Sequence, residues 1–241
     1  DRHTTFLLDR EYPNDFQMII YKLLHRLTIR WANMTIVTND FLANIVSELH
    51  GKPFVLPDPL PEISYTGGNK LKGNVNIFMI SSFGIDEPIS EVLHAMKEFK
   101  DDVVLYISGN NKKLDRKIKE SAPENIVFTG FLNDQDFINM LFSAEVIMVL
   151  TTAEACMLCG CYEAVAAEKP LITSNKQALK DYFTGAVFVE NDQIGISNGI
   201  KLVLSDLNKY KDNILTLKDK LQNKWMYQFK VLENEIKYLE R

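Results

Sequence analysis

The sequence predicts an α/β protein, in which a doubly wound parallel sheet follows the remnant of a second α/β domain. Three observations predict it. Short apolar runs recur along the chain, helical segments separate them, and one proline-rich stretch interrupts the alternation. Near-continuous apolar strands separated by helices are typical of parallel sheets covered on both faces, with right-handed crossovers.

The first expected element is an amphipathic helix over residues 14–31, with Asn14 or Asp15 able to cap its start. The residues at helical spacing are Phe16, Ile19, Ile20, Leu23, Leu24, Leu27 and Trp31. The other face carries Lys22, Arg26 and Arg30, which indicates a solvated face or contact with a membrane surface or an anionic acceptor. A strand, a helix and a strand follow: Met34–Thr38, Asn39 or Asp40 to about His50, and Phe54–Pro57.

Residues 57–70 hold three prolines and two adjacent glycines, which favour a linker between domains. The alternation then restarts. The expected strands are Asn76–Ile80, Val103–Ile107, Ile126–Phe128, Val146–Leu150, Leu171–Thr173 and Ala186–Val189. The sequence therefore predicts four parts: a domain remnant (residues 1–57), a linker (58–74), a doubly wound domain (75–206) and a terminal helix (207–241).

The terminal helix carries one apolar stripe, composed of Tyr210, Ile214, Leu217, Leu221, Trp225, Phe229, Leu232 and Ile236. The stripe lacks a regular heptad alternation, so it specifies no partner helix. We expect the helix either to pack back across the chain's own domains or to pair with a partner helix.

Composition excludes several classes of protein. The 241 residues carry 27 Lys and Arg against 32 Asp and Glu, a formal net charge of -5, so no overall basic field exists to hold nucleic acid. No apolar run approaches the roughly 20 residues that span a bilayer, and the start resembles no signal peptide. We expect a cytoplasmic protein, with peripheral contact at the inner face of the membrane left open, and a chain truncated at its N-terminus.

The cysteines Cys156, Cys159 and Cys161 are crowded and odd in number, which suits a reduced compartment better than a disulfide framework. None of the four histidines adds a ligand spacing, so we expect no metal site and no cofactor. The thiols are expected to be small core-facing groups.

Polar, small-residue loops follow four of the expected strands: Ser81–Pro88, Ser108–Asn111, Thr129–Asp134 and Thr151–Ala155. Parallel strands deliver such loops to one edge of the sheet, where open α/β proteins bind ligands. A helix opening after Gly160 would offer free amides and a partial positive charge, which suit a phosphate.

Two carboxylates flank this helix start. Glu163 is expected in its first turn, where the helix dipole alone would favour it, and Glu154 lies in the preceding loop. A bound phosphate would repel Glu163 unless its carboxylate accepts hydrogen bonds from hydroxyl groups. Two carboxylates around an anion site would suit a molecule with hydroxylated rings at both ends and phosphate between them, which describes a nucleotide-sugar.

At this point the sequence resembles a known family. The segments GCYEAVAAEKPLITSN, ISSFGIDEP and FTGFLND, together with Glu154, resemble the Rossmann-like nucleotide-binding half of GT-B glycosyltransferases of the family-4 type. TIVTNDFLANIV and FVLPDPLPE resemble the end of the acceptor-side domain and the linker in bacterial polysaccharide members. The resemblance implies a GT-B-like fold and metal-independent, retaining sugar transfer from a nucleotide-diphosphate donor to a carbohydrate or lipid-linked acceptor.

The resemblance also implies roles for residues. Glu154 would contact the transferred sugar and Glu163 the ribose, while the helix start offers backbone amides to the diphosphate. His3, with Asp1 as a base, would face the donor sugar from the acceptor side. The remaining donor-binding residues implied are Ser82, Phe83, Gly84 and Asp86 near the phosphates, Gly109 and Asn110 after the second strand, Thr129, Gly130 and Phe131 near the base, and Gly160 and Cys161 at the helix start.

The sequence departs from the family pattern at three places. Eight residues separate the two glutamates where seven are usual, and Glu168 stands where Gly is common, in a left-handed conformation that costs a side chain about 1 kcal/mol. The Ser81–Pro88 loop also lacks the cationic residues that many members use to neutralise the diphosphate, and Lys112 or Lys113 are candidate substitutes.

Two other functions remain open. Because the cations are missing and the first domain is short, the chain could instead be an inactive, glycosyltransferase-like scaffold that binds an active enzyme through residues 207–241. The same architecture also serves sugar-nucleotide epimerases, which require acid and base groups in the first domain.

Overall fold

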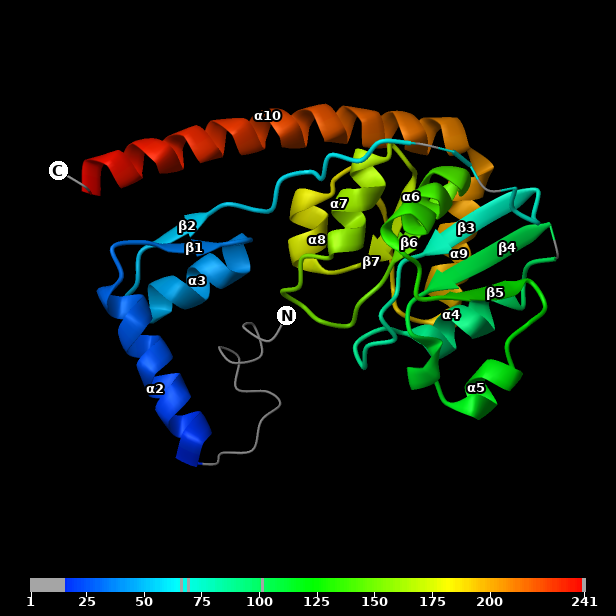
Figure 1. Ribbon diagram of the computed structural model, residues 1–241, viewed down its shortest axis with the longest axis horizontal. Coiled ribbons are helices and arrows are strands. Elements are labelled where there is room, and N and C mark those ends of the chain that lie inside the picture. The colour runs from blue at the N-terminus through cyan, green and yellow to red at the C-terminus, as the bar shows by residue number, and fades with distance from the viewer. Residues whose placement is uncertain (1–15, 66, 69, 101, 240–241) are drawn as a thin grey trace. The chain divides into compact units, whose positions relative to one another are not determined.

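The computed structural model describes residues 16–65, 67–68, 70–100 and 102–239 (Figure 1). They form two compact units. The first comprises the described residues up to Pro59, with Ala155–Met157 and the chain from Leu221 onward; the second comprises Leu60–Glu154 and Leu158–Lys220.

The first unit contains helix α2 (Phe16–Trp31), strand β1 (Thr35–Val37), helix α3 (Asp40–Glu48) and strand β2 (Pro53–Val55). The two strands pair in parallel. The Asn39 side chain caps α3 by accepting a hydrogen bond from the Leu42 amide at 3.0 Å. The expected strand, helix and strand are therefore confirmed; β1 and α3 are slightly shorter than expected, and β2 begins one residue earlier and ends two residues earlier.

Helix α2 confirms the expected helix, but its apolar stripe is not its buried face. Ile19, Leu23 and Trp31, which belong to the apolar stripe, are exposed, and Trp31 is 76% exposed. Among the described side chains of α2, the buried one is Ile29, which lies outside that stripe and packs against Val37 and Val46. Asn14 and Asp15, expected to cap the helix, lie outside the described residues.

The second unit is built on a six-stranded parallel sheet in the order β5-β4-β3-β6-β7-β8. The strands are β3 (Val75–Met79), β4 (Val103–Ser108), β5 (Ile126–Gly130), β6 (Val146–Val149), β7 (Leu171–Ser174) and β8 (Val187–Val189). All six expected strands are confirmed within two residues at each end. The doubly wound α/β fold is also confirmed.

The helices of this unit are α4 (Ile89–Met96), η1 (Asn111–Lys113), α5 (Arg116–Glu120), α6 (Asp134–Ser143), α7 (Cys159–Ala166), α8 (Gln177–Tyr182), α9 (Gln193–Ser205) and the start of α10 (Leu207–Leu239). Helices α4 and α9 cover one face of the sheet, where Val92 and Ile200 pack with Ile77 (Figure 1). On the other face Phe78 meets Phe137 of α6 edge-on. Apolar strands buried on both faces explain the continuous apolar runs in the sequence.

Helix α10 confirms the expected terminal helix. Of its apolar stripe, Ile214, Leu217, Leu221 and Leu232 are buried, whereas Phe229 and Ile236 are exposed. Within the first unit, the Trp225 indole donates to the Pro57 carbonyl at 3.0 Å. Among the described residues, no helix is both long and apolar enough to cross a bilayer.

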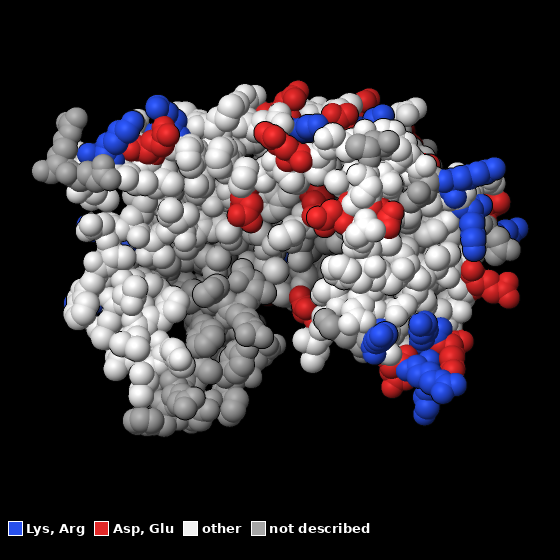
Figure 2. Space-filling view, in the orientation of Figure 1, with Lys and Arg blue, Asp and Glu red and all other residues white. Residues whose placement is uncertain are grey.

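On the face shown in Figure 2, a group of basic side chains gathers over α5. Arg116 of this helix pairs with Glu120 at 2.6 Å, and both side chains are largely exposed. Acidic side chains are spread over the same face. The basic group is therefore mixed with carboxylates and forms no continuous cationic stripe of the kind that binds nucleic acid.

Candidate functional site

The carboxyl ends of the six parallel strands lie along one edge of the sheet. The strand order changes direction between β3 and β6, because β4 and β5 lie beyond β3 while β7 and β8 lie beyond β6. Open α/β sheets bind ligands at this switch point. The loops that leave β3 and β6 both begin there, and together with helix α7 they hold more than half of the residues expected in the site.

The loop after β3 is organised around the Glu87 carboxylate. It accepts hydrogen bonds from the Ser81 hydroxyl, from the Ser82 amide at 2.9 Å and hydroxyl at 2.8 Å, and from the Phe83 amide at 3.1 Å. An internal carboxylate thus occupies the ring of donors that a phosphate could use. Phe83 also has a positive φ of 53°, and its side chain is buried in the core.

Asp86 ties the loop after β3 to the loop after β6. Its carboxylate accepts from the Thr151 hydroxyl at 2.7 Å, and its carbonyl accepts from the Thr152 amide at 2.7 Å. The Thr151 amide donates to the Ser174 hydroxyl at 2.9 Å, and the Asn191 side chain donates to the Thr151 carbonyl at 2.8 Å. This buried network fixes the strand ends, and it places Asp86 in a structural position. Gly84 stands directly beside it, since an added Cβ would lie 2.7 Å from the Asp86 carboxylate.

Gly109, at the end of β4, permits a close backbone approach. Its φ is +106°, and a Cβ there would lie 2.3 Å from the Ser81 carbonyl oxygen. Its amide donates to the Gly130 carbonyl at 3.1 Å. The ends of β3, β4 and β5 are therefore held together through backbone that only glycine fits.

The end of β5 is more open. Gly130 has a φ of +75° with open space where a Cβ would lie, and Phe131 beside it is 86% exposed. The Thr129 hydroxyl donates to the Gly130 carbonyl at 2.9 Å, while the Asn110 side chain accepts from the Lys112 amide at 3.2 Å. Thr129 and Gly130 thus belong to the strand, whereas the exposed ring of Phe131 is left as a ligand-accessible group.

Helix α7 begins at Cys159, earlier than expected, because Gly160 fits closely against the Val149 and Ile80 side chains and joins the first turn. The Cys161 amide donates to the Leu158 carbonyl at 3.0 Å. The Gly160 amide has no acceptor among the described residues. The expectation of core-facing thiols is right for Cys161, which is buried, and wrong for Cys159, which is exposed.

Glu163 is the fifth residue of α7 and not part of its first turn, because the helix starts two residues early. Its carboxylate is half-buried, and burial raises the pKa of Glu163 above its ordinary value near 4.5. No hydrogen bond or ion pair to the Glu163 carboxylate occurs in the described part of the chain. A helix-start role therefore does not explain this residue.

Glu154 lies in the loop after β6 with a side chain that is 56% exposed. The Lys176 ammonium, which follows β7, donates to the Glu154 Oε1 atom at 2.7 Å. The Lys176 side chain is only 18% exposed. The site thus pairs a covered cation with a solvent-facing carboxylate, which sequence reasoning missed because the two residues are far apart in the chain.

Two expected residues cannot be placed, because His3 and Asp1 lie outside the described residues. In the part of the chain that is described, no group of three His, Cys, Asp or Glu side chains could hold a metal ion.

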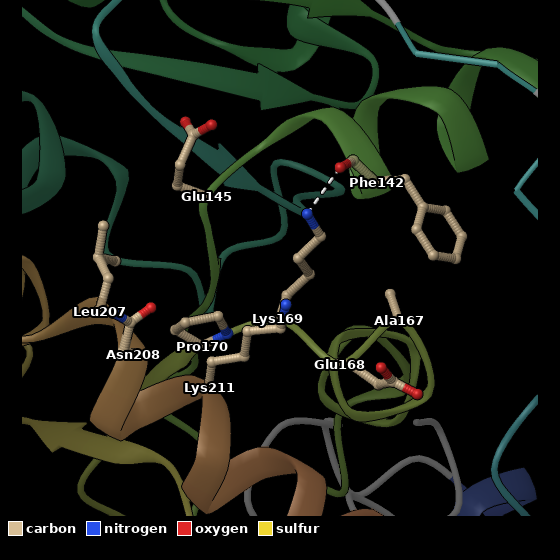
Figure 3. A pocket seen from close by; sticks show the side chains of 9 residues that line it. All are labelled: Phe142, Glu145, Ala167, Glu168, Lys169, Pro170, Leu207, Asn208 and Lys211. Carbon is tan, nitrogen blue, oxygen red and sulfur yellow. Dashed lines mark hydrogen bonds between the residues drawn. The ribbon is translucent and has the colours of Figure 1, made fainter.

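A cavity of about 420 Å³ lies at the opposite edge of the sheet (Figure 3). Its lining includes Glu145 and Pro170, which directly precede β6 and β7. The Lys169 ammonium donates to the carbonyls of Phe142 at 2.6 Å and Ala144 at 2.8 Å, and burial lowers the pKa of Lys169. Since Lys169 satisfies the last carbonyls of α6, its role here is structural.

Glu168, which also lines this cavity, has a φ of +59°. The expected left-handed conformation is therefore confirmed. Its carboxylate accepts from the Lys218 ammonium at 2.8 Å, and Lys218 also donates to the Ala166 carbonyl at 3.0 Å. The ion pair explains how a residue other than glycine is held at the end of α7.

Comparison with solved structures supports the fold. The chain is similar to sucrose-phosphate synthase from Thermosynechococcus elongatus, with a TM-score of 0.74 and 16% identity over 93% of this chain and 62% of that one. It is similar to Anabaena HepE in complex with UDP and glucose, with a TM-score of 0.72 and 11% identity over 90% and 66% of the two chains. It is also similar to a glycosyltransferase from Rickettsia africae, with a TM-score of 0.71 and 14% identity over 96% of this chain and 69% of that one. The chain thus spans about two thirds of these structures or slightly less.

Comparison with curated proteins found no match. The family model described as glycosyl transferases group 1 matches residues 67–215, which is more than half of the chain. The matched region contains the whole six-stranded sheet and both Glu154 and Glu163. The chain therefore belongs to the glycosyl transferases of group 1 and has the GT-B fold.

Proposed function

We propose that the chain is a glycosyltransferase that moves a sugar from a nucleotide-diphosphate donor to a carbohydrate or lipid-linked acceptor, in cytoplasmic polysaccharide biosynthesis. The observation that carries the proposal is Glu163, a half-buried carboxylate without a cation partner in the described chain, on a helix that starts at the switch point of the sheet. Membership of the family and the UDP and glucose bound to Anabaena HepE support it.

The donor would lie across the start of α7. Amides of the first turn, including that of Gly160, would receive the diphosphate, since a helix N-terminus favours negative charge. Glu163 would accept hydrogen bonds from the ribose hydroxyls, which would offset the cost of burying its carboxylate. The exposed carboxylate of Glu154 would accept hydrogen bonds from the transferred sugar.

In the reaction the bond between the sugar carbon and the diphosphate oxygen breaks, the oxygen of the acceptor hydroxyl forms the new bond to that carbon, and the proton of this hydroxyl passes to the departing diphosphate. Negative charge then grows on the departing diphosphate, where preorganised amides stabilise it most. Retention of configuration belongs to the proposal through the resemblance, as does a role for His3 beside the donor sugar with Asp1 as a base.

Helix α2 supports a lipid-linked acceptor and peripheral membrane contact. Ile19, Leu23 and Leu24 expose apolar surface, while Arg26 and Arg30 are exposed on the same helix. Apolar and basic groups on one exposed helix favour an anionic lipid surface. Co-sedimentation with vesicles rich in anionic lipid should fall after Arg26→Glu with Arg30→Glu, and unchanged binding would exclude this contact.

A second function, an inactive scaffold, is favoured by one observation. Glu87 takes up the amides and hydroxyls of the loop after β3, and residues 81–88 contain no Lys or Arg. A diphosphate would find the hydrogen-bond donors of this loop already bound to Glu87. A scaffold would bind no nucleotide and would instead associate with a protein partner.

Thermal unfolding with UDP, GDP, ADP and dTDP separates the two functions. An active site predicts selective stabilisation by one diphosphate, which reaches about 2.7 kcal/mol at 100 times its dissociation constant. Glu163→Gln should reduce the shift by about half or more, whereas Glu124→Gln, the same change at an exposed position, should keep it. No shift with any of the four, combined with concentration-dependent association, would favour the scaffold.

A further inference from the structure

The two members of the ion pair between Lys176 and Glu154 differ in their exposure to solvent. The Lys176 side chain is 18% exposed and the Glu154 side chain 56% exposed, although their charged atoms are 2.7 Å apart. The surrounding protein therefore holds the lysine in position, while the carboxylate is free to turn toward solvent. A pair in this setting contributes little to stability, because solvent screens its open side and desolvation of the covered member offsets the attraction.

The electrostatics of this edge require a cation. The carboxylates of Asp86, Glu87, Glu154 and Glu163 all belong to the loops or the helix at the carboxyl ends of β3 and β6. A donor diphosphate would add further negative charge, against which the start of α7 offers only about half a positive charge. Helix amides alone would leave the bound diphosphate facing a net negative site.

Lys176 is the best placed cation. Among the described side chains of the loops that leave the six strands, the cationic ones are Lys112, after β4, and Lys176, after β7. β7 pairs directly with β6, whose loop leads into α7, whereas β3 lies between β4 and β6. The Thr151 amide also donates to Ser174, so the ends of β6 and β7 are joined beside Lys176.

We infer that Lys176 is a further donor-binding residue, which holds the diphosphate of the nucleotide-sugar and is retained by Glu154 while the site is empty. On donor binding, Lys176 exchanges the Glu154 carboxylate for phosphate oxygens, and Glu154 becomes available to the sugar hydroxyls. The exchange is inexpensive because an ion pair open to solvent contributes little. This inference rests on the proposed function. The loop after β3 lacks a cation for the diphosphate, and Lys176 in the loop after β7 supplies one instead.

Calorimetric titration of the full chain tests it, with UDP, GDP, ADP and dTDP and with the four matching nucleosides. Lys176→Met keeps the length of the side chain and removes its charge. It should weaken binding of the preferred diphosphate about tenfold and leave binding of the nucleoside unchanged, because only the diphosphate meets the lysine. Lys180→Met, the same change on the neighbouring helix α8, should leave both affinities as in the wild type.

Glu154→Gln provides the second test. This variant lacks the carboxylate that retains Lys176, so the diphosphate without sugar should bind more tightly. The gain in affinity should vanish when Lys176→Met is added. A structural ion pair predicts instead that both variants change the unfolding temperature and leave diphosphate affinity alone.

The outcomes distinguish the inference from the proposed function. Equal diphosphate affinity in the wild type and in Lys176→Met overturns the inference and leaves the proposed function standing. Failure of the wild-type chain to bind any of the four diphosphates overturns both.

Discussion

The two edges of the six-stranded sheet treat buried charge differently. At the amino ends of the strands, charged side chains have protein partners. Lys169 donates to two carbonyls at the end of α6, Lys218 pairs with Glu168, and the Glu145 carboxylate accepts from the Asn76 amide at 2.7 Å. These groups are explained by the folded chain alone.

At the carboxyl ends, two carboxylates are not explained in this way. Glu163 is half-buried and has no cation partner in the described chain, and Glu154 turns a largely exposed carboxylate toward a single lysine. Burying a carboxylate without hydrogen-bond donors costs stability. The charged groups at the amino ends of the strands are accounted for by the stability of the fold. A bound ligand with hydroxyl donors, as proposed above, would account for the two carboxylates at the carboxyl ends.

Removing a partnered charge at the amino edge should give the largest loss of stability. Lys169→Met leaves the Phe142 and Ala144 carbonyls without their donor, so we expect a loss of about 2 kcal/mol, in the range of hydrogen bonds from charged groups. Urea unfolding measures it. Diphosphate binding should be unchanged. Reduced binding would contradict the assignment of Lys169 to stability alone.

The conformation of Glu168 sharpens the same comparison. Glu168→Ala and Glu168→Gly both lose the pair with Lys218, but only glycine accepts a φ of +59° without a Cβ penalty. The glycine variant should therefore be more stable than the alanine variant by about 1 kcal/mol. Equal stability of the two in urea unfolding would show that the left-handed backbone carries no strain.

Replacing Glu163 should raise the free energy of unfolding, whereas replacing Lys169 at the amino ends of the strands should lower it. Because burial raises the pKa of Glu163 in the folded chain, the native state binds more protons than the unfolded state above about pH 4.5. Wild-type stability relative to Glu163→Gln should fall as the pH rises from about 4.5 through the raised pKa. Unfolding of both chains across that pH range measures the difference, and a constant difference would remove the argument from uncompensated burial.

The smallest effect is expected at Glu98, just beyond α4. Hydrogen bonds from Lys201 and then Ser197 lower the pKa of Glu98 to about 2, so its contribution is present above the unfolded value near 4.5 and is lost as the pH falls toward 2. Lys201→Met should flatten this acid-side loss in thermal unfolding. An unchanged acid limb would show that the exposed pair is of no consequence for stability.

Much of the fold follows from local patterns. The strands β3 to β8 are predictable because each is a short apolar run, although the edge strand β5 is only half-buried. The packing of α2 is not, since its wide apolar surface exceeds what a two-stranded sheet and one helix can cover, and Ile29 alone of its described side chains is buried. The start of α7 is hard to predict because Cys159 and Gly160 carry no start signal, and Leu158 makes no side-chain cap.

The site is predictable in outline but not in its connections. Glu154 and Glu163 stand out in the sequence because carboxylates are unexpected beside a phosphate site. The partners that organise the loops do not stand out: Glu87 resembles an ordinary loop carboxylate, and Thr151 and Asn191 meet only through the order of the strands. Lys176 and Glu154 likewise meet because β6 and β7 are neighbouring strands. Local sequence patterns do not predict which strands pair.

The most direct measurement is a calorimetric titration of three chains with UDP, GDP, ADP and dTDP: the wild type, Glu163→Gln at the carboxyl edge and Lys169→Met at the amino edge. We predict that one diphosphate binds the wild type saturably, that Glu163→Gln weakens it about tenfold or more, as expected when hydrogen bonds to a charged group are lost, and that Lys169→Met leaves it unchanged. No binding to the wild type, or equal binding by wild type and Glu163→Gln, would contradict the assignment of the carboxyl edge as the donor site.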